Sequence, residues 1–512
     1  MIDEKNNLIS NFGSLKPKLI DNITLLNKVN INLPTCPPFS TRSSIQAEKK
    51  QKLSFWIEGY GCSASFADME MIAGQLIDNG FEISNNPDKA SINLIVTCSV
   101  KETTEHKMVH RIKSLSKNNK PLIVAGCLPS ADQKLVQKIN PYASLMSPNS
   151  INKTMEIVKS TLNGHKTIHL QNSGLEKISF PKFRINPVIS IVEIASGCLS
   201  ECSFCQTKLA KGYLQSYRIG NIINQVKSDL STGSHEIWLT STDNGCYGKD
   251  IGTNLVELLK KIDEIEEDFK IRVGMMNPMY LKDMIKDLTE IYSKSDKIFK
   301  FIHIPVQSGS ERVLRKMKRG HTAKTFKDIV KQFREKIPDM TIATDIITGY
   351  PEETDEDFEL TLKMIKETEP DIVNSSRFSP RPGTLASKSK SIGRETMAQR
   401  SEKLHRIIKN IAKNRNSRWL NWKGDVLIDE MDSEKMKGRN LHYKSIIIKD
   451  LNENKPIDST DNCNNNENFS RSLGSLYSMR LNNHNDNFFL GKTIMVRVTG
   501  YSNHSLEGIL IT

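Results

Sequence analysis

The sequence predicts an α/β protein with an N-terminal parallel-sheet α/β domain, a central partial (βα)6 barrel and a C-terminal small β-barrel. Three observations predict this class. Short β-branched runs alternate with helical segments from Leu53 onward, as expected for parallel strands joined by crossover helices. The alternation resumes after Pro187, with about six units at TIM-like spacing, too few to close an eight-stranded barrel. Beyond Trp422 the strand-like runs follow one another without helices, as in a small barrel.

The length and local composition divide the chain into domains. At ~150 residues per domain, 512 residues leave room for roughly three domains. We expect a flexible polar extension at 1–50, an α/β domain at 51–165, the partial barrel at 186–415 and the β-domain at 420–512. An Asn-rich insertion near 451–487 splits the last domain, and its low apolar content predicts a disordered loop. Cys463 lies in this insertion and is treated as incidental.

The net charge and the number of cysteines limit the kinds of partner and chemistry to expect. The formal net charge is +13, which favours an acidic partner such as nucleic acid, although a Lys/Asn-rich composition bias would also produce it. Ser387–Lys423 holds eleven Lys/Arg against two acids. No apolar run reaches the ~18 residues of a membrane span, and no export signal is recognisable, so we expect a cytoplasmic protein. Nine cysteines in such a chain favour metal or redox chemistry over disulfides.

Three upstream cysteines each follow a predicted strand. Cys62 ends LSFWIEGYGC, Cys98 follows INLIVT and Cys127 follows PLIVAG. Because ligands gather outside the carboxyl ends of parallel strands, these cysteines can meet at one edge of the sheet. The alternative is three small buried residues, since free cysteine is often buried. Gly61 and Gly126 directly precede two of them, which indicates loops rather than strand interiors.

A second cysteine group opens the partial barrel. Cys198, Cys202 and Cys205 have the spacing CxxxCxxC after a strand, which can hold three irons of a cubane iron–sulfur cluster and leave the fourth iron open. Zinc is the competing interpretation. A structural zinc site takes four Cys/His ligands, and no fourth follows at the usual spacing; His235 is remote in sequence.

This motif resembles that of the radical S-adenosylmethionine (SAM) superfamily, and Phe204 before the third cysteine fits the superfamily pattern. Three upstream cysteines, the motif and a terminal β-domain together resemble the methylthiotransferases, over about 53–512 apart from the insertion. Three shorter stretches are similar to the archaeal and eukaryotic type that acts on tRNA N6-threonylcarbamoyladenosine: CQTKLAKGYLQSY, IWLTSTDNGCYGKDIG and SPRPGTLA.

The resemblance implies two [4Fe-4S] clusters. Cys198, Cys202 and Cys205 would hold the cluster that binds SAM, and the three upstream cysteines would hold an auxiliary cluster that carries the sulfur. It further implies an RNA-binding TRAM-like β-domain and a flavodoxin- or ferredoxin-like electron donor. One SAM would supply the methyl group and a second a 5′-deoxyadenosyl radical, which removes hydrogen from C2 of adenosine 37. An unactivated aromatic C–H bond lies beyond acid–base catalysis, so a radical cofactor suits this step.

Two residues depart from the family pattern. Lys211 stands where the family has arginine, and lysine keeps the charge without the bidentate fork. Cys246 stands in STDNGCYG, where a small residue without a thiol is usual. Neither position is a predicted cluster ligand.

Polar residues at strand ends are candidates for SAM binding, because the strand ends of a βα barrel line its site. Ordinary capping of loops and helices explains such residues equally well. The candidates are Ser241, Asp243, Asn277, Gln307 and Thr348. His303 has apolar flanks and is expected to be a core histidine rather than a contact to substrate or cofactor.

Basic residues next to the predicted β-domain are candidates for phosphate contacts. They are Arg400, Arg406, Lys409, Arg415 and Arg418. A second basic run, Glu311–Lys336, either meets the RNA backbone or forms a solvated helix face. Tyr443 and Tyr501 are candidates for stacking on bases.

Other functions stay open on the sequence alone. The enzyme could act on isopentenyladenosine tRNA or on a ribosomal protein. A non-catalytic RNA-binding protein with structural zinc is a rival from another class, although two groups of three cysteines do not suit it. An iron–sulfur electron-transfer protein would have no use for the basic segment or the β-domain.

Overall fold

A computed structural model describes residues 52–171, 174, 176–432, 435–449, 471–472 and 489–511. The predicted extension 1–50 lies outside the described residues, as does the insertion 451–487 with Cys463 apart from one short strand, β18 (Arg471–Ser472). That strand pairs antiparallel with β1 (Ser54–Gly59). Within the described ranges, no helix is long and apolar enough to cross a membrane.

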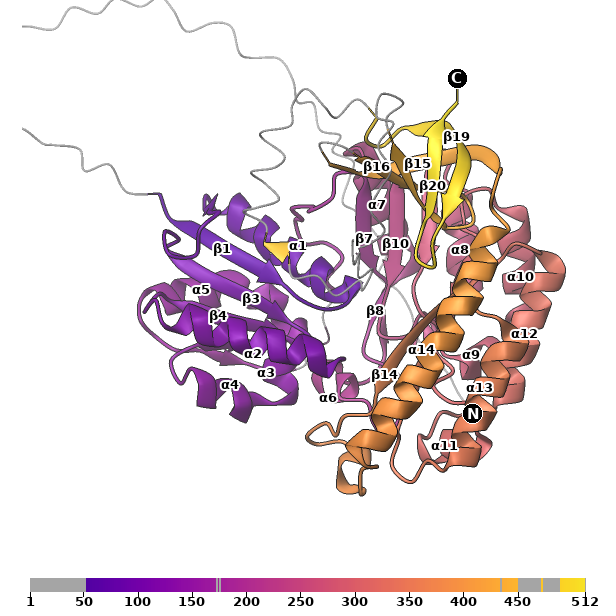
Figure 1. Cartoon of the computed structure of the whole chain (residues 1–512). Coiled ribbons are helices and arrows are strands. Elements are labelled where there is room, and N and C mark those ends of the chain that lie inside the picture. The colour runs from indigo at the N-terminus through magenta and orange to yellow at the C-terminus, as the bar shows by residue number, and fades with distance from the viewer. Residues whose placement is uncertain are drawn as a thin grey trace, which may run out of the picture. The chain divides into compact units, whose positions relative to one another are not determined.

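The N-terminal part forms a sheet in the order β18-β1-β3-β4-β5-β6, with β2 beside β1; it is the indigo to purple part of the chain in Figure 1. All its pairings except that of β18 are parallel. The remaining strands are β2 (Glu82–Ile83), β3 (Ile92–Thr97), β4 (Leu122–Gly126), β5 (Ser144–Met146) and β6 (Ile168–His169). The helices are α1 (Ser63–Asp78), α2 (Glu102–Ser116), α3 (Cys127–Ala131), α4 (Gln133–Ile139), the 3-10 turn η1 (Pro148–Lys153) and α5 (Thr154–Leu162).

Helices cover both faces of this sheet. Phe55 and Ile57 of β1 pack with residues of α1 and α5, whereas Trp56 between them packs with residues of α2. Successive side chains of a strand point to opposite faces, so a strand buried on both faces reads as a continuous apolar run. The carboxyl ends of β1, β3 and β4 are therefore adjacent at one edge.

The central part contains six strands in two three-stranded sheets with parallel neighbours, β11-β10-β7 and β12-β13-β14. The sheets adjoin where the Met276 N–H donates to the His303 carbonyl at 2.9 Å. The strands are β7 (Ile189–Glu193), β10 (Glu236–Thr240), β11 (Lys270–Val273), β12 (Phe301–His303), β13 (Thr341–Thr348) and β14 (Ile372–Arg377). A two-stranded ribbon adds β8 (Ala195–Ser196) and β9 (Gln215–Ser216).

Helices follow these strands and bury a shared apolar core. The longest, α14 (Arg394–Ser417), packs against β14 and α13 (Figure 1). The others are α6 (Thr207–Lys211), α7 (Ile219–Ser231), α8 (Leu255–Asp263), α9 (Pro278–Leu281), α10 (Ile285–Lys294), α11 (Glu311–Lys316), α12 (Ala323–Lys336) and α13 (Asp355–Thr368), with the 3-10 turns η2 (Asn244–Cys246) and η3 (Ala386–Lys388).

The C-terminal part is a closed five-stranded barrel in the order β15-β16-β17-β20-β19. Its strands are β15 (Lys423–Asp432), β16 (Lys435–Arg439), β17 (Ser445–Lys449), β19 (Thr493–Tyr501) and β20 (Leu506–Leu510). Alternate residues such as Val426, Ile428, Val496 and Val498 fill its interior. The predicted fold class, with its parallel sheet, six-stranded partial barrel and small β-barrel, is confirmed.

Candidate functional site

The upstream cysteines lie at the carboxyl ends of three adjacent strands. Cys62 caps α1 after β1, Cys98 follows β3, and Cys127 begins α3 directly after β4. A close backbone approach brings two of them together. Gly61 has φ +110°, and a Cβ there would overlap the Cβ of Cys98. Only glycine fits a position with this φ and this contact.

The thiols of this upstream group interact with one another. A hydrogen bond with the Cys98 thiol holds the pKa of Cys62 well below its usual range, and the same bond raises the pKa of Cys98. Burial raises the pKa of Cys127 to about 12, and the charge of Lys211 opposes that shift. Cys98 and Cys127 are buried, whereas Cys62 is exposed. Three thiols that interact electrostatically, one of them exposed, are a donor set that fits an iron–sulfur cluster with an accessible iron.

The second group, Cys198, Cys202 and Cys205, occupies the loop between β8 and α6. Gly197 opens this loop with φ +70°, and a Cβ there would overlap the Tyr213 carbonyl oxygen. The Ser200 N–H donates to Cys198 Sγ at 3.2 Å. Burial and the charges of the other two cysteines raise the pKa of Cys205. The three cysteines thus share one short loop, and their role as cluster ligands stays a prediction.

Arg319 contacts this loop, although the sequence does not single it out. Its guanidinium donates to Cys202 Sγ at 3.1 Å and to the Pro305 carbonyl at 2.7 Å. It is buried, and other basic residues of the run Glu311–Lys336 pair with carboxylates, as Lys324 does with the surface Asp328 and Arg334 does with the buried Asp371. No local pattern separates Arg319 from that run. The run spans α11 and α12, and Arg319, in the loop between these helices, contacts the cysteine loop.

The predicted SAM candidates are found in different parts of the barrel, and two of them lie beside the cysteine loop. Asp243 and Asn277 lie beside the cysteine loop: Asp243 Oδ1 accepts the N–H groups of Gly245 and Asn277, both at 3.0 Å, and Asn277 Nδ2 donates to Ser200 Oγ at 3.3 Å. Burial and the charge of Cys198 raise the pKa of Asp243 to about 7.

The remaining SAM candidates have other surroundings. Ser241 donates to Asn244 Oδ1 at 3.0 Å. Gln307 follows β12 with φ +77°, and Thr348 ends β13 and donates to the Ser376 carbonyl at 3.4 Å. Thr348 lies on the second three-stranded sheet of the barrel, and Gln307 is bridged to Ile346 of that sheet, apart from the strand that leads to Asp243.

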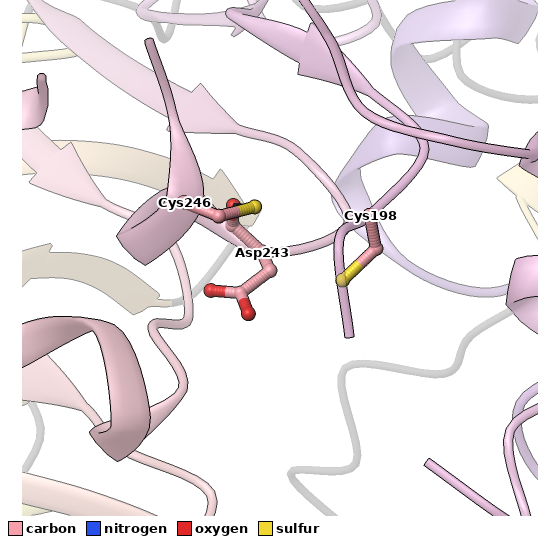
Figure 2. A group of neighbouring side chains, drawn as sticks. All are labelled: Cys198, Asp243 and Cys246. Atoms are coloured by element: carbon pink, nitrogen blue, oxygen red, sulfur yellow. Dashed lines mark hydrogen bonds between the residues drawn. The ribbon is translucent and has the colours of Figure 1, made fainter. Parts of the chain in front are cut away.

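Cys246 lies beside Cys198 of the cysteine loop. The sequence does not predict this contact. Figure 2 shows its sulfur and that of Cys198 on either side of the Asp243 side chain. One ligand atom from each of these three residues lies within 4.8 Å of the other two, and all three residues are buried. A hydrogen bond with the Cys246 thiol lowers the pKa of Cys198 to about 6.

Lys211 belongs to a buried ion network beside the upstream cysteines. Its Nζ donates to Glu193 Oε1 at 3.0 Å. Lys177 pairs with Glu193 and donates to Asp68 Oδ1 at 2.6 Å. Because Asp68 belongs to α1 and Lys211 to α6, the network links the N-terminal sheet to the cysteine loop of the barrel. The lysine therefore keeps a positive charge beside the upstream thiols.

His303 is paired within the barrel, in agreement with the expectation of a core histidine. Its Nε2 lies 2.9 Å from Asp345 Oδ1, which also accepts from Asn374 at 2.9 Å. Burial acts to raise the pKa of Asp345, but His303 and Asn374, with the charge of Lys101, together outweigh it and the pKa is lowered.

Two of the predicted RNA contacts are corrected. Arg400 is buried and pairs with Glu353 and Asp355. Arg415 is buried and pairs with Asp371. These guanidinium groups serve internal ion pairs, so a phosphate backbone does not reach them.

Three of the five predicted RNA contacts remain on the surface. Arg406, Lys409 and Arg418 are exposed, along or just after α14. Of the two candidates for stacking on bases, Tyr443 is buried against Phe299 and Phe301, so its ring is not available to a base. Tyr501 at the end of β19 is exposed.

Two family models match the chain. Residues 192–365 match the Radical SAM superfamily, and residues 54–147 match the Uncharacterized protein family UPF0004. The two matches cover the two regions that hold the cysteine groups.

Curated relatives match over most of their length. A probable threonylcarbamoyladenosine tRNA methylthiotransferase of Pyrococcus abyssi is 40% identical over 403 residues, which are 77% of this chain and 93% of that protein. The threonylcarbamoyladenosine tRNA methylthiotransferase of Homo sapiens is 36% identical over 403 residues, 77% of this chain and 69% of that protein. Among solved structures, the radical S-adenosylmethionine methyltransferase TsrM from Kitasatospora setae matches with a TM-score of 0.49 and 12% identity, covering 66% of this chain and 75% of that one.

Proposed function

The chain belongs to the family of the threonylcarbamoyladenosine tRNA methylthiotransferases, and we propose on that basis that it installs a methylthio group at C2 of N6-threonylcarbamoyladenosine at position 37 of tRNA. At the coarser level it is a radical SAM methylthiotransferase that modifies tRNA. The observation that carries the proposal is the pair of three-cysteine groups, one at the sheet edge and one in the barrel loop. The relatives' shared name favours this nucleoside over isopentenyladenosine, and the catalytic family disfavours a zinc-containing RNA-binding protein.

The barrel loop fits the cluster that belongs to radical SAM enzymes. Cys198, Cys202 and Cys205 would hold it, with SAM on the open iron, and together they would supply a radical able to break an unactivated C–H bond. Arg319 places a positive charge against Cys202 Sγ, which suits a cluster whose thiolates make it anionic. Asp243 and Asn277, joined by a 3.0 Å hydrogen bond, would orient the polar groups of SAM beside Cys198.

We place a second [4Fe-4S] cluster on Cys62, Cys98 and Cys127. The convergence of these thiols around a close glycine contact supports it. The exposure of Cys62 leaves the site accessible to a substrate, and the buried Lys211 would offset part of the cluster's negative charge.

The substrate side of the proposal rests on exposed basic residues. Arg406, Lys409 and Arg418 would contact tRNA phosphates next to the five-stranded barrel, which would act as the TRAM-like RNA-binding module. Electrons would come from a flavodoxin- or ferredoxin-like donor, and the reaction would take place in the cytoplasm.

The experiment that tests the proposal is anaerobic purification with iron and sulfide analysis of the wild type and two triple variants. One variant changes Cys198, Cys202 and Cys205 to alanine, and the other changes Cys62, Cys98 and Cys127. We expect about eight irons in the wild type and about four in each variant. Wild type with SAM and a reductant should then convert threonylcarbamoyladenosine tRNA to its methylthio form, measured by mass spectrometry of the nucleosides, and neither variant should. Zinc without iron after reconstitution would refute it.

A further inference from the structure

Cys246 has no part in either predicted cluster, yet it lies beside a ligand of one. One atom from each of Cys198, Asp243 and Cys246 lies within 4.8 Å of the other two, and the exposed fractions of these residues are 7%, 2% and 0%. Figure 2 shows the Asp243 side chain between Cys246 and Cys198. Two thiols and a carboxylate form a recognised donor set for a soft divalent cation.

The surrounding backbone holds these three side chains in place. Asp243 Oδ1 accepts the N–H groups of Gly245 and Asn277 at 3.0 Å each. Cys198 Sγ accepts the Ser200 N–H at 3.2 Å, and Cys246 belongs to the turn η2 that Asp243 caps. Such outer contacts orient ligands and raise metal affinity.

We propose that Cys198, Asp243 and Cys246 bind one soft divalent cation, such as zinc, when the chain lacks its cluster. The cation would take two sulfur ligands and one carboxylate oxygen, with the fourth position filled by water. Cys198 belongs to both sites, so the cation and the cluster exclude each other. Zinc at this site blocks cluster assembly on the CxxxCxxC loop.

The proposed site differs from the other two cysteines of the loop by its carboxylate. The Arg319 guanidinium lies 3.1 Å from Cys202 Sγ, and its charge also acts on Asp243. Lys208 contributes a second positive charge beside Cys198. Asp243 sets a carboxylate against these cations, and this negative charge favours a dication beside Cys198 and Cys246.

Anaerobic titration of the cluster-free, full-length protein with Co2+ tests the site. We expect the first equivalent to give thiolate-to-cobalt charge transfer and tetrahedral d–d absorption. Cys246→Ala and Asp243→Asn should each weaken this binding by at least about tenfold. Cys205→Ala removes a cysteine of the same loop that lies outside the site. Its cobalt affinity should stay within about twofold of the wild-type affinity.

Two outcomes would overturn the proposal. One is cobalt binding in Cys246→Ala that equals the wild type. The other is a loss in Cys205→Ala as large as that in Cys246→Ala, which would place the cation on the CxxxCxxC motif. Cys246→Ser serves as a second variant, and it should keep weaker binding because oxygen replaces sulfur.

A competition experiment tests whether bound zinc blocks assembly of the iron–sulfur cluster. Zinc added at one equivalent before iron and sulfide should lower the iron content of the wild type, whereas Cys246→Ala should load iron as fully as without zinc. Iron loading in Cys246→Ala without zinc shows that the variant folds. Equal inhibition of both proteins by zinc would contradict the proposal. Neither readout depends on methylthio transfer, so failure here leaves the proposed function untouched.

Discussion

At the scale of single residues, glycine decides where the upstream cysteines meet. Gly61 combines a positive φ of +110° with a Cβ position that overlaps the Cβ of Cys98, so any side chain there is both strained and clashing. The motif GYGC predicts a loop before Cys62, but the contact with Cys98 depends on two strands lying side by side.

We predict that Gly61→Ala lowers the free energy of unfolding by about 1–3 kcal/mol, because it adds a clash to the backbone strain. Chemical denaturation of the cluster-free protein measures the loss. The matched control is Gly80→Ala, whose φ of +83° is similar but whose Cβ would meet no atom within 4 Å. Equal losses in the two variants would show that strain alone matters and that the approach of Cys98 does not.

At the scale of elements, buried ion pairs connect segments that are far apart in sequence. Lys177, which is 1% exposed, joins Asp68 of α1 to Glu193 of β7. Removing one partner of a buried pair leaves the other charge without compensation.

We predict that Lys177→Met costs about 3–5 kcal/mol of stability, since two carboxylates then lose a partner. Lys153→Met removes an exposed pair with Glu156 and should cost less than about 1 kcal/mol. The difference between the two denaturation midpoints checks the prediction. A loss in Lys177→Met as small as that in Lys153→Met would show that the network contributes little.

A second network connects β14, α14 and the small barrel. Asp371, just before β14, accepts from Lys444 at 2.8 Å and from Arg415 at 3.1 Å. Burial acts to raise the pKa of Asp371, but Lys444 and Arg415 outweigh it and lower the pKa from 3.8 to about 2.

We predict acid sensitivity from this carboxylate. Because the pKa of Asp371 is lower in the folded than in the unfolded protein, its carboxylate stabilises the fold at pH values above its unfolded pKa near 3.8. This contribution, about 2 kcal/mol, is lost as the pH falls through about 2. Stability measured from pH 5 to pH 2 should therefore fall more steeply in the wild type than in Asp371→Asn. Parallel curves would assign the acid loss to other carboxylates.

At the scale of the whole molecule, the exposed face of α14 and the C-terminal barrel are the predicted tRNA surface. Arg406 and Lys409 are exposed on α14, and α14 contacts β19 of the barrel. Phosphate contacts contribute affinity that depends strongly on salt.

We predict that Arg406→Glu and Lys409→Glu each weaken tRNA binding and lower the slope of log affinity against log salt by about 1. Iron content should stay at the wild-type level, because neither residue touches a cysteine group. Lys89→Glu, at an exposed lysine of the N-terminal domain, is the control and should change neither quantity. An unchanged slope in the α14 variants would move the RNA surface elsewhere.

The fold class and both cysteine groups follow from the amino-acid sequence alone. Strand periodicity is local, and parallel strands carry their ligands at one edge, so the pattern of strands predicts Cys62, Cys98 and Cys127 at one edge of the sheet. That the three strands before them are neighbours is shown only by the order of the sheet. The spacing of Cys198, Cys202 and Cys205 is likewise a property of one short loop.

Tertiary packing settles which other residues share the site. Arg319 and Cys246 reach the cysteine loop from segments 117 and 48 residues away from Cys202 and Cys198, and no local pattern marks them. Arg400 and Arg415 read as RNA contacts but are buried in ion pairs, since a basic stretch does not reveal which of its charges meet carboxylates. Contacts between distant segments depend on packing, which periodicity and motif spacing do not encode.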